Sequence, residues 1–297
     1  MSVNDARQLA VLDPGVAESS AAATPAARAR EAALVAWIRE RGRVAIGFSG
    51  GVDSAYLACV AVDAVGSEGT LAIIGRSASY PAAQWAAARA VADRFGVPVL
   101  ELDTHEMEDP RYAANPTNRC YFCKSELWSL LVPAAAARGI DTVIDGTNAD
   151  DLGDHRPGAA AANERGVLSP LAILGFTKAE IRALSRERGI PTWAQPSSPC
   201  LSSRLPYGTA VTPTRLAQVE RAEAALRALG VAGDLRVRHH GELARIELGA
   251  AERDRWLAAD CAPLVLAVRD AGFARVARDL RGFRSGSRNV LSGGTAA

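Results

Sequence analysis

Residues 49–54 have the sequence Ser-Gly-Gly-Val-Asp-Ser, and this stretch decides the fold. The apolar residues 44–48 before it are typical of a strand, and residues 55–65 after it are typical of a helix. A strand that breaks at paired glycines before a helix presents backbone N–H groups at the positive end of the helix dipole, where phosphate oxygens bind. No lysine follows the glycines, which excludes the nucleotide loop that ends in Gly-Lys-Ser/Thr. We therefore expect a different polyphosphate-binding loop, formed by Ser49, Gly50, Gly51, Asp53 and Ser54.

Strands and helices alternate in the first part of the chain. Short apolar runs typical of buried strands occupy residues 44–48, 71–74, 97–102 and 142–144. We expect helices between them at about 81–95 and 124–138, and Pro133 should kink the second helix or remove one of its hydrogen bonds. Thr177 and Glu180 form a capping box for a later helix. This alternation predicts an α/β fold, with a parallel sheet covered by helices on both faces and all strands delivering their loops to one edge.

The pattern changes near Pro196. We expect helices at 213–229 and 252–271 and strands at 235–239, 243–248 and 275–280. The first two of these strands alternate polar and apolar residues. This order predicts a smaller α+β domain whose strands are polar on one face. The expected division is a flexible lead-in (1–29), a first domain (30–195), a C-terminal substrate or oligomerisation domain (196–284) and a flexible tail (285–297).

The composition of the chain limits the kinds of function that we expect. The 297 residues include 48% hydrophobic and 23% charged side chains, which is ordinary for a soluble globular protein. The formal net charge of +1 gives no overall field toward nucleic acid or an anionic membrane. No apolar run approaches the ~20 residues that a membrane span requires. The N-terminal residues lack the basic start and apolar core of a signal peptide, so we expect a cytoplasmic protein without structural disulfides.

An acidic segment follows the fourth expected strand. It begins Asp145-Gly146-Thr147-Asn148 and continues to Asp154. Such segments are often solvated turns, but this one leaves the sheet at the same edge as the glycine loop. Its carboxylates are therefore expected to hold Mg²⁺ against phosphates or to shape the acceptor site. Asp53 also has two interpretations, as a ligand of Mg²⁺ or as a cap for the following helix.

Cysteines form the second strong pattern. Cys120 and Cys123 form a Cys-x-x-Cys motif, and Cys200 follows much later in the chain. Arg119 and Lys124 flank the pair, and nearby positive charge favours thiolates. The pair alone fits a redox couple, a zinc clip or iron–sulfur ligands.

The metal that such cysteines would hold stays open on the residues alone. Zinc needs a fourth ligand, which His105 or His155 would supply. Three thiolates without a fourth ligand suit a [4Fe–4S] cluster with one open iron, so the residues favour neither metal over the other. Cys59 and Cys261 are expected to be small buried hydrophobes.

Arginines cluster in the sequence after the last of these three cysteines. Arg204 and Arg215 precede an expected strand that carries Arg236 and Arg238. Because residues two apart share one face of a strand, Arg236 and Arg238 are expected to bind one phosphate or carboxylate together. The alternative is a solvated edge strand.

Four segments together resemble the LarE family of ATP-dependent sulfur transferases: residues 49–54, 118–124, 145–148 and 198–204. The last segment, with Pro-Cys-Leu-x-Ser-Arg, is the most specific, and residues 236–238 and 244–247 also match. The resemblance spans about residues 30–285. It implies a PP-loop ATP pyrophosphatase domain, similar to the adenine nucleotide alpha hydrolases, with Gly146 among the ATP-binding residues.

The resemblance also implies a reaction in nickel-pincer cofactor biosynthesis. ATP would adenylylate a carboxylate of pyridinium-3,5-biscarboxylic acid mononucleotide, and sulfur would then displace AMP to give a thiocarboxylate. Arg204, Arg236 and Arg238 would bind this small-molecule substrate, and family members form homo-oligomers.

The family uses two sources of sulfur. Some members surrender the sulfur of one cysteine, which matches Cys200, and others carry an extra sulfide on a [4Fe–4S] cluster. The presence of Cys120 and Cys123 besides Cys200 favours the cluster, with all three as ligands. The alternatives are tRNA thiolation by the same adenylylation, which the near-neutral charge disfavours, and a non-catalytic nucleotide sensor whose cysteines hold zinc.

Overall fold

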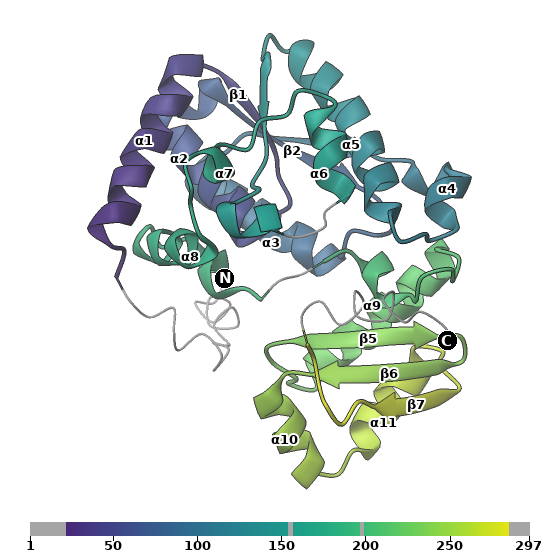
Figure 1. Ribbon diagram of the computed structural model, residues 1–297. Coiled ribbons are helices and arrows are strands. Elements are labelled where there is room, and N and C mark those ends of the chain that lie inside the picture. The colour runs from purple at the N-terminus through teal and green to yellow at the C-terminus, as the bar shows by residue number, and fades with distance from the viewer. Residues whose placement is uncertain (1–21, 154–156, 197–198, 285–297) are drawn as a thin grey trace, which may run out of the picture. The chain divides into compact units, whose positions relative to one another are not determined.

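The computed structural model describes residues 22–153, 157–196 and 199–284. These residues divide into two compact units, one within Val16–Ser198 and the other from Pro199 onward (Figure 1). The expected domain limits stay predictions, and the expected tail lies outside the described residues. Helix α1 (Pro25–Arg41) buries Ala27, so the last residues of the expected lead-in are helical rather than flexible.

A four-stranded parallel sheet forms the centre of the first unit, in the order β3-β2-β1-β4. Its strands are β1 (Val44–Gly47), β2 (Thr70–Arg76), β3 (Val99–Asp103) and β4 (Thr142–Ile144). All four expected strands are confirmed, with small differences at their ends. Because the strands are parallel, the loops that follow them lie at one edge of the sheet.

Helices account for most of the remaining residues of this unit. Besides α1, its described helices are α2 (Val52–Gly69), α3 (Ala82–Phe95), α4 (Pro110–Ala113), α5 (Arg119–Ala136), α6 (Pro157–Asn163), α7 (Pro170–Ile173) and α8 (Lys178–Glu187). Short 3-10 helices are η3 (Glu106–Glu108), η4 (Ala149–Gly153) and η5 (Pro191–Ala194). None of the helices in the described parts of the chain is long and apolar enough to cross a membrane.

Side chains that alternate along the strands pack into two cores on opposite faces of the sheet. Val44 and Ile46 belong to one core, which α1, α2, α3 and α8 complete. Ala45 belongs to the other core, together with Trp128 of α5. Figure 1 shows α1, α2 and α8 on one side of this sheet and α5 and α6 on the other. The expected arrangement of helices on both faces is confirmed.

Helix α5 begins earlier than the sequence indicates. The expected start is near Lys124, whereas the helix starts at Arg119 and includes the Cys-x-x-Cys motif in its first turns. Its cap residue Asn118 makes no side-chain cap hydrogen bond. The buried Arg119 donates to Asn115 Oδ1 at 2.5 Å, so a side-chain contact with the preceding loop contributes to this helix start. Pro133 lies inside the helix.

The second unit is a smaller α+β structure, as expected. Strand β5 (Leu235–His240) pairs antiparallel with β6 (Leu243–Leu248), and β6 pairs parallel with β7 (Arg275–Arg278). The helices are η6 (Leu201–Arg204), α9 (Pro213–Ala228), α10 (Ala250–Ala258) and α11 (Ala262–Asp270). Helices α9 and α11 pack against each other, α9 against β5 and α11 against β7.

Two expectations for this unit are wrong. The single helix expected at 252–271 is two helices, because Asp260 accepts a hydrogen bond from the Ala262 N–H and Pro263 occupies the first turn of α11. The second is the alternative of a solvated edge strand at residues 236–238. In β5, however, the residues from Leu235 to His239 are all buried, including two arginines.

Candidate active site

The glycine loop connects β1 to α2. Gly50 has a φ of +69°, in the left-handed region that favours glycine, and Gly51 caps α2 in an extended conformation. The Ser54 hydroxyl donates to the Gly51 carbonyl at 3.2 Å and accepts from the Ser49 N–H at 3.3 Å. The first N–H groups of a helix have no partners within it, so this loop and the start of α2 together offer an anion site.

Residues after β2 hold the glycine loop in place. The Tyr80 hydroxyl donates to the Ser49 carbonyl at 3.0 Å, and Gln84 Nε2 donates to the same oxygen at 2.8 Å. Burial, and then the charge of Glu101, raises the pKa of Tyr80, so its hydroxyl stays a neutral donor. The sequence analysis missed both residues, because a tyrosine and a glutamine near a helix start form no recognisable motif.

Gly146, which follows β4, packs against the start of α2. A Cβ at this position would lie 2.9 Å from the Ser54 backbone nitrogen and 3.2 Å from the Asp53 carbonyl carbon. Backbone atoms cannot yield at such distances, so only glycine permits this approach. The structure thus brings together the six residues expected to bind ATP, Ser49, Gly50, Gly51, Asp53, Ser54 and Gly146. Their contact with ATP stays a prediction.

The Asp53 carboxylate contacts side chains from two distant segments. It forms an ion pair with the Lys178 ammonium at the start of α8. It also accepts a hydrogen bond from Nδ2 of the buried Asn148 at 3.4 Å. The interpretation of Asp53 as the helix cap is wrong, since Gly51 is the cap residue of α2. The sequence analysis missed Lys178, which there is only the first residue of a capped helix.

Other carboxylates after β4 bind groups of the protein. Asp145 accepts from the Ser169 hydroxyl at 2.7 Å. Asp150 accepts from the Lys178 N–H at 2.7 Å, and Asp151 accepts from a backbone N–H of its own loop at 3.1 Å. These contacts fix the loop, and the expected part of these aspartates in an acceptor site stays a prediction.

Cys120 and Cys123 lie on one side of α5, because residues three apart on a helix are neighbours. Cys120 is exposed and Cys123 is half-buried, and neither is in a disulfide. Two accessible thiols at this spacing fit part of the ligand set of zinc or of an iron–sulfur cluster.

A complete metal site is not visible in the described residues, where no group of three or more His, Cys, Asp and Glu side chains is arranged to hold an ion. The expected zinc ligand His105 lies beside Glu108, with 3.4 Å between Nδ1 and Oε1. Among the described residues, His105 forms no metal-binding group with Cys120 and Cys123. The other expected ligand, His155, and the acidic Asp154 lie outside the described residues.

Arg204 organises the loop that carries Cys200. Its side chain is 2% exposed, and its guanidinium makes two hydrogen bonds of 2.9 Å to Glu223. The same guanidinium donates to the carbonyl oxygens of Pro199 and, at 3.2 Å, of Cys200. Arg204 thus holds the backbone around Cys200, and its expected contact with a substrate stays a prediction.

Arg236 and Arg238 are buried rather than solvated, with 4% and 8% of each residue exposed. Arg238 donates from Nε to Glu247 Oε2 at 2.9 Å and from Nη1 to the Ser203 carbonyl at 3.0 Å. The alternative of a solvated edge strand is therefore wrong. The contact with Ser203 connects β5 to the segment that follows Cys200.

Arg236 has some contacts that favour its positive charge, but its burial opposes that charge. Its guanidinium lies 4.9 Å from the centre of the Phe283 ring and donates to the Leu235 carbonyl at 2.6 Å. Burial, and then the nearby charge of Arg204, lowers the pKa of Arg236 to about 10. Arg236 stays protonated at neutral pH, and a bound anion would stabilise its charged form.

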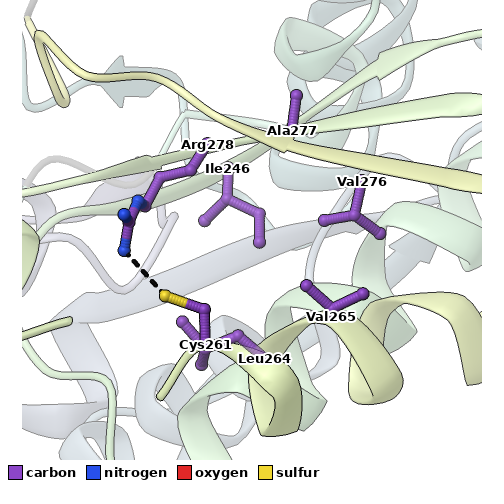
Figure 2. Close-up of a pocket in the computed structure, with 7 residues that line it drawn as sticks. All are labelled: Ile246, Cys261, Leu264, Val265, Val276, Ala277 and Arg278. Atoms are coloured by element: carbon purple, nitrogen blue, oxygen red, sulfur yellow. Dashed lines mark hydrogen bonds between the residues drawn. The ribbon is translucent and has the colours of Figure 1, made fainter. Parts of the chain in front are cut away.

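The two remaining cysteines differ from each other. Cys59 is buried in α2, as expected, and burial raises the pKa of its thiol to about 12. Cys261 is not a buried hydrophobe, because its thiol donates to the Trp256 carbonyl and accepts from Arg278 Nη1, both at 3.1 Å. Figure 2 shows the contact between Cys261 and Arg278 beside a small cavity that Leu264 also lines.

Cys120, Cys123 and the glycine loop belong to the first unit, whereas Cys200 and the buried arginines belong to the second. The expected convergence of the three thiols therefore stays a prediction. The first unit carries the glycine loop and the thiol pair, and the second unit carries the Cys200 loop with its arginines.

Comparisons with known proteins agree with these features. Residues 29–115 match the NAD synthase family. The chain is 35% identical over 260 residues to the pyridinium-3,5-bisthiocarboxylic acid mononucleotide synthase of Lactiplantibacillus plantarum, an alignment that covers 88% of this chain and 94% of that protein. It is 45% identical over 251 residues to an uncharacterised protein of Synechocystis, covering 84% and 93% of the two chains. The chain therefore belongs to the LarE family of PP-loop enzymes, the family of the pyridinium-3,5-bisthiocarboxylic acid mononucleotide synthase.

Proposed function

We propose that the protein is an ATP-dependent sulfur transferase that converts a carboxylate of pyridinium-3,5-biscarboxylic acid mononucleotide into a thiocarboxylate. The observation that carries the proposal is the glycine loop, with left-handed Gly50 and the close approach of Gly146. Such a loop accepts phosphate oxygens, because no side chain blocks their approach. Its occurrence in a chain 35% identical to a mononucleotide synthase supports this particular substrate.

The proposed reaction has two steps. A carboxylate oxygen of the substrate attacks the α-phosphorus of ATP, the bond from that phosphorus to the bridging oxygen breaks, and pyrophosphate leaves. The substrate then carries AMP on its acyl carbon, so a sulfur nucleophile can form the C–S bond while the C–O bond to AMP breaks. The glycine loop would bind the pyrophosphate. Asp53 would hold Mg²⁺, whose charge would offset that of the phosphates.

Buried arginines of the second unit would bind the phosphate of the substrate. Arg236 and Arg238 lie on β5, and the charge of Arg204 contributes to the lowered pKa of Arg236. An anion beside these groups would stabilise their charged forms, and phosphate matches the geometry of guanidinium donors.

Cys200 is the residue on which the sulfur chemistry would depend. In the first version, Cys120, Cys123 and Cys200 ligate a [4Fe–4S] cluster, which would supply a sulfide held at its open iron. The paired, accessible thiols of α5 support this version. In the second version, the Cys200 sulfur itself forms the C–S bond, and loss of the Cα proton with cleavage of the Cβ–S bond leaves dehydroalanine.

The variant Cys200→Ala tests the proposal. We expect it to abolish thiocarboxylate formation while pyrophosphate release from ATP and the carboxylate substrate continues. Cys261→Ala is the matched control and should retain both activities, since its thiol bonds to Trp256 and Arg278 instead. Thiolation by Cys200→Ala at the wild-type rate would overturn the sulfur assignment.

Anaerobic purification separates the two versions. The cluster predicts a brown protein that contains iron and sulfide, and Cys120→Ala or Cys123→Ala should bleach it. A colourless protein with stoichiometric zinc would refute the cluster. Dehydroalanine at position 200 after one turnover, detected by mass spectrometry, would establish the sacrificial version instead.

A further inference from the structure

Two side chains from the segment after β2 donate to one carbonyl oxygen of the glycine loop. The Tyr80 hydroxyl lies 3.0 Å from the Ser49 carbonyl oxygen, and Gln84 Nε2 lies 2.8 Å from it. A carbonyl oxygen has two lone pairs, so these two donors satisfy it completely. Ser49 is exposed, and water could make the same bonds there. Two protein donors in the place of water fix the direction in which this carbonyl points.

The direction of the Ser49 carbonyl also sets the direction of the Gly50 N–H. Both groups belong to one planar trans peptide, in which the C=O and the N–H point in opposite directions. Gly50 is a buried residue, and within the described parts of the chain its N–H donates no hydrogen bond. Backbone N–H groups of buried residues rarely lack an acceptor, so this N–H is a donor that a ligand can use.

The two donors lie on fixed elements. Ser79 precedes Tyr80 and donates from its buried hydroxyl to Glu106 Oε1 at 3.1 Å. Gln84 belongs to the first turn of α3, and the next turn of this helix packs against the glycine loop at Ala88. Donors on fixed elements hold a group in one orientation at a small entropic cost.

We propose that Tyr80 and Gln84 are positioning residues of the adenylylation step. Together they hold the peptide between Ser49 and Gly50 so that its N–H donates to a phosphate oxygen of ATP, while neither side chain contacts the nucleotide. Hydrogen bonds to the carbonyl also polarise the peptide, which makes its N–H a stronger donor. This inference deepens the proposed function and rests on it, since it requires that the glycine loop binds ATP.

Calorimetric titration of the full chain with pyrophosphate, in EDTA to remove divalent ions, measures the contribution of the two donors. Tyr80→Phe and Gln84→Met each remove one donor and keep most of the side-chain volume. Each should weaken pyrophosphate binding about two- to tenfold, and the double variant about ten- to hundredfold, because a freed peptide spends less time in the competent orientation. Wild-type affinity in the double variant would overturn the inference.

Magnetic resonance of the peptide itself separates positioning from direct contact with the ligand. Cell-free synthesis with serine labelled by ¹³C at its carbonyl and glycine labelled by ¹⁵N marks three peptides doubly: Ser49–Gly50, Ser285–Gly286 and Ser292–Gly293. The signal that is lost in Ser49→Ala belongs to the loop.

Two signals of this peptide then report on the proposed role. On saturation of the wild type with pyrophosphate, the Gly50 amide proton should move downfield, as for a new hydrogen bond. The Ser49 ¹³C signal should not move upfield, because its carbonyl keeps both donors. An unmoved Gly50 proton would overturn the inference. So would an upfield move of the Ser49 carbonyl signal, which would mean that the two donors leave it for the ligand.

Trp85→Phe is the matched control for disturbance of α3. Trp85 follows Gln84 and donates from Nε1 to Glu101 Oε1 at 3.1 Å, so the change removes a hydrogen bond from the same helix turn and keeps both donors to Ser49. Its pyrophosphate affinity should stay within about twofold of wild type. A loss as large as that of the double variant would overturn the inference. If the wild type binds neither pyrophosphate nor ATP, the proposed function itself fails.

Discussion

Gly50 and Gly51 are adjacent in the loop, but substitution of each by alanine should have a different effect. In Gly50→Ala, the new Cβ would lie 2.5 Å from the Ala88 Cβ and 2.9 Å from the Ala88 Cα, at a residue whose φ is +69°. In Gly51→Ala, the nearest atom would be the Ser49 Oγ at 3.5 Å, and the φ of −70° suits alanine. The first change strains the fold, whereas the second adds a methyl group where phosphate is expected.

The expected sizes of the two effects differ clearly. A left-handed conformation costs alanine about 1–2 kcal/mol, and overpacking against Ala88 adds about 1–3 kcal/mol. The free energy of unfolding should therefore fall by about 2–5 kcal/mol in Gly50→Ala. In Gly51→Ala it should stay within about 0.5 kcal/mol of wild type, as for an unstrained surface change. ATP affinity of Gly51→Ala should nevertheless fall about ten- to hundredfold, as when a charge-assisted hydrogen bond is lost.

Thermal unfolding and calorimetric titration with ATP measure the two effects separately. For a unit of this size, each kcal/mol moves the midpoint of unfolding by about 2–4 °C, so Gly50→Ala should unfold visibly earlier. Two results contradict the reasoning. One is wild-type ATP affinity in a folded Gly51→Ala, and the other is an unchanged midpoint in Gly50→Ala.

Three further predictions concern cysteine reactivity, pH and a buried ion pair. Because burial raises the pKa of Cys59 to about 12, iodoacetamide at pH 8 should spare Cys59 until the protein unfolds, whereas it should alkylate the exposed Cys120 of cluster-free protein, as mass spectrometry of peptides can show. Burial lowers the pKa of His239 in the folded protein, so below about pH 6.5 the unfolded chain binds a proton at this residue more readily than the folded protein does. The free energy of unfolding should therefore fall as the pH drops below about 6.5, and urea titrations of His239→Gln should show a smaller fall. Glu223→Gln removes the charge that Arg204 binds through two hydrogen bonds and should lower the free energy of unfolding by about 3–5 kcal/mol; an unchanged urea midpoint would contradict this.

The sequence predicts the first unit well because its signals are local. Short apolar runs give the strands, the paired glycines give the turn at Gly50, and the capping box at Thr177 gives the start of α8. The start of α5 escapes such reasoning. Asn118 offers no side-chain cap there, and the contact between the buried Arg119 and Asn115, although local, follows no recognised capping motif.

In the second unit, the alternation of polar and apolar residues along a strand does not predict which face is buried. Alternation along β5 identifies Arg236 and Arg238 as neighbours on one face but does not indicate whether that face is covered. Burial of these arginines depends on partners from elsewhere in the chain, such as Glu247 of β6 for Arg238 and the ring of Phe283 for Arg236. The break between α10 and α11 was readable, since Pro263 marks a new helix start.

Lys178 illustrates a limit of reading motifs along the chain. The glycine loop contains no lysine, which distinguishes it from the loop that ends in Gly-Lys-Ser/Thr. A lysine nevertheless lies beside the loop, because the Lys178 ammonium forms an ion pair with the Asp53 carboxylate. This lysine belongs to the start of α8, 125 residues further along the chain than Asp53. The motif therefore does not show which charged groups surround the loop, because the lysine that pairs with Asp53 is identified only by the packing of α8 beside α2.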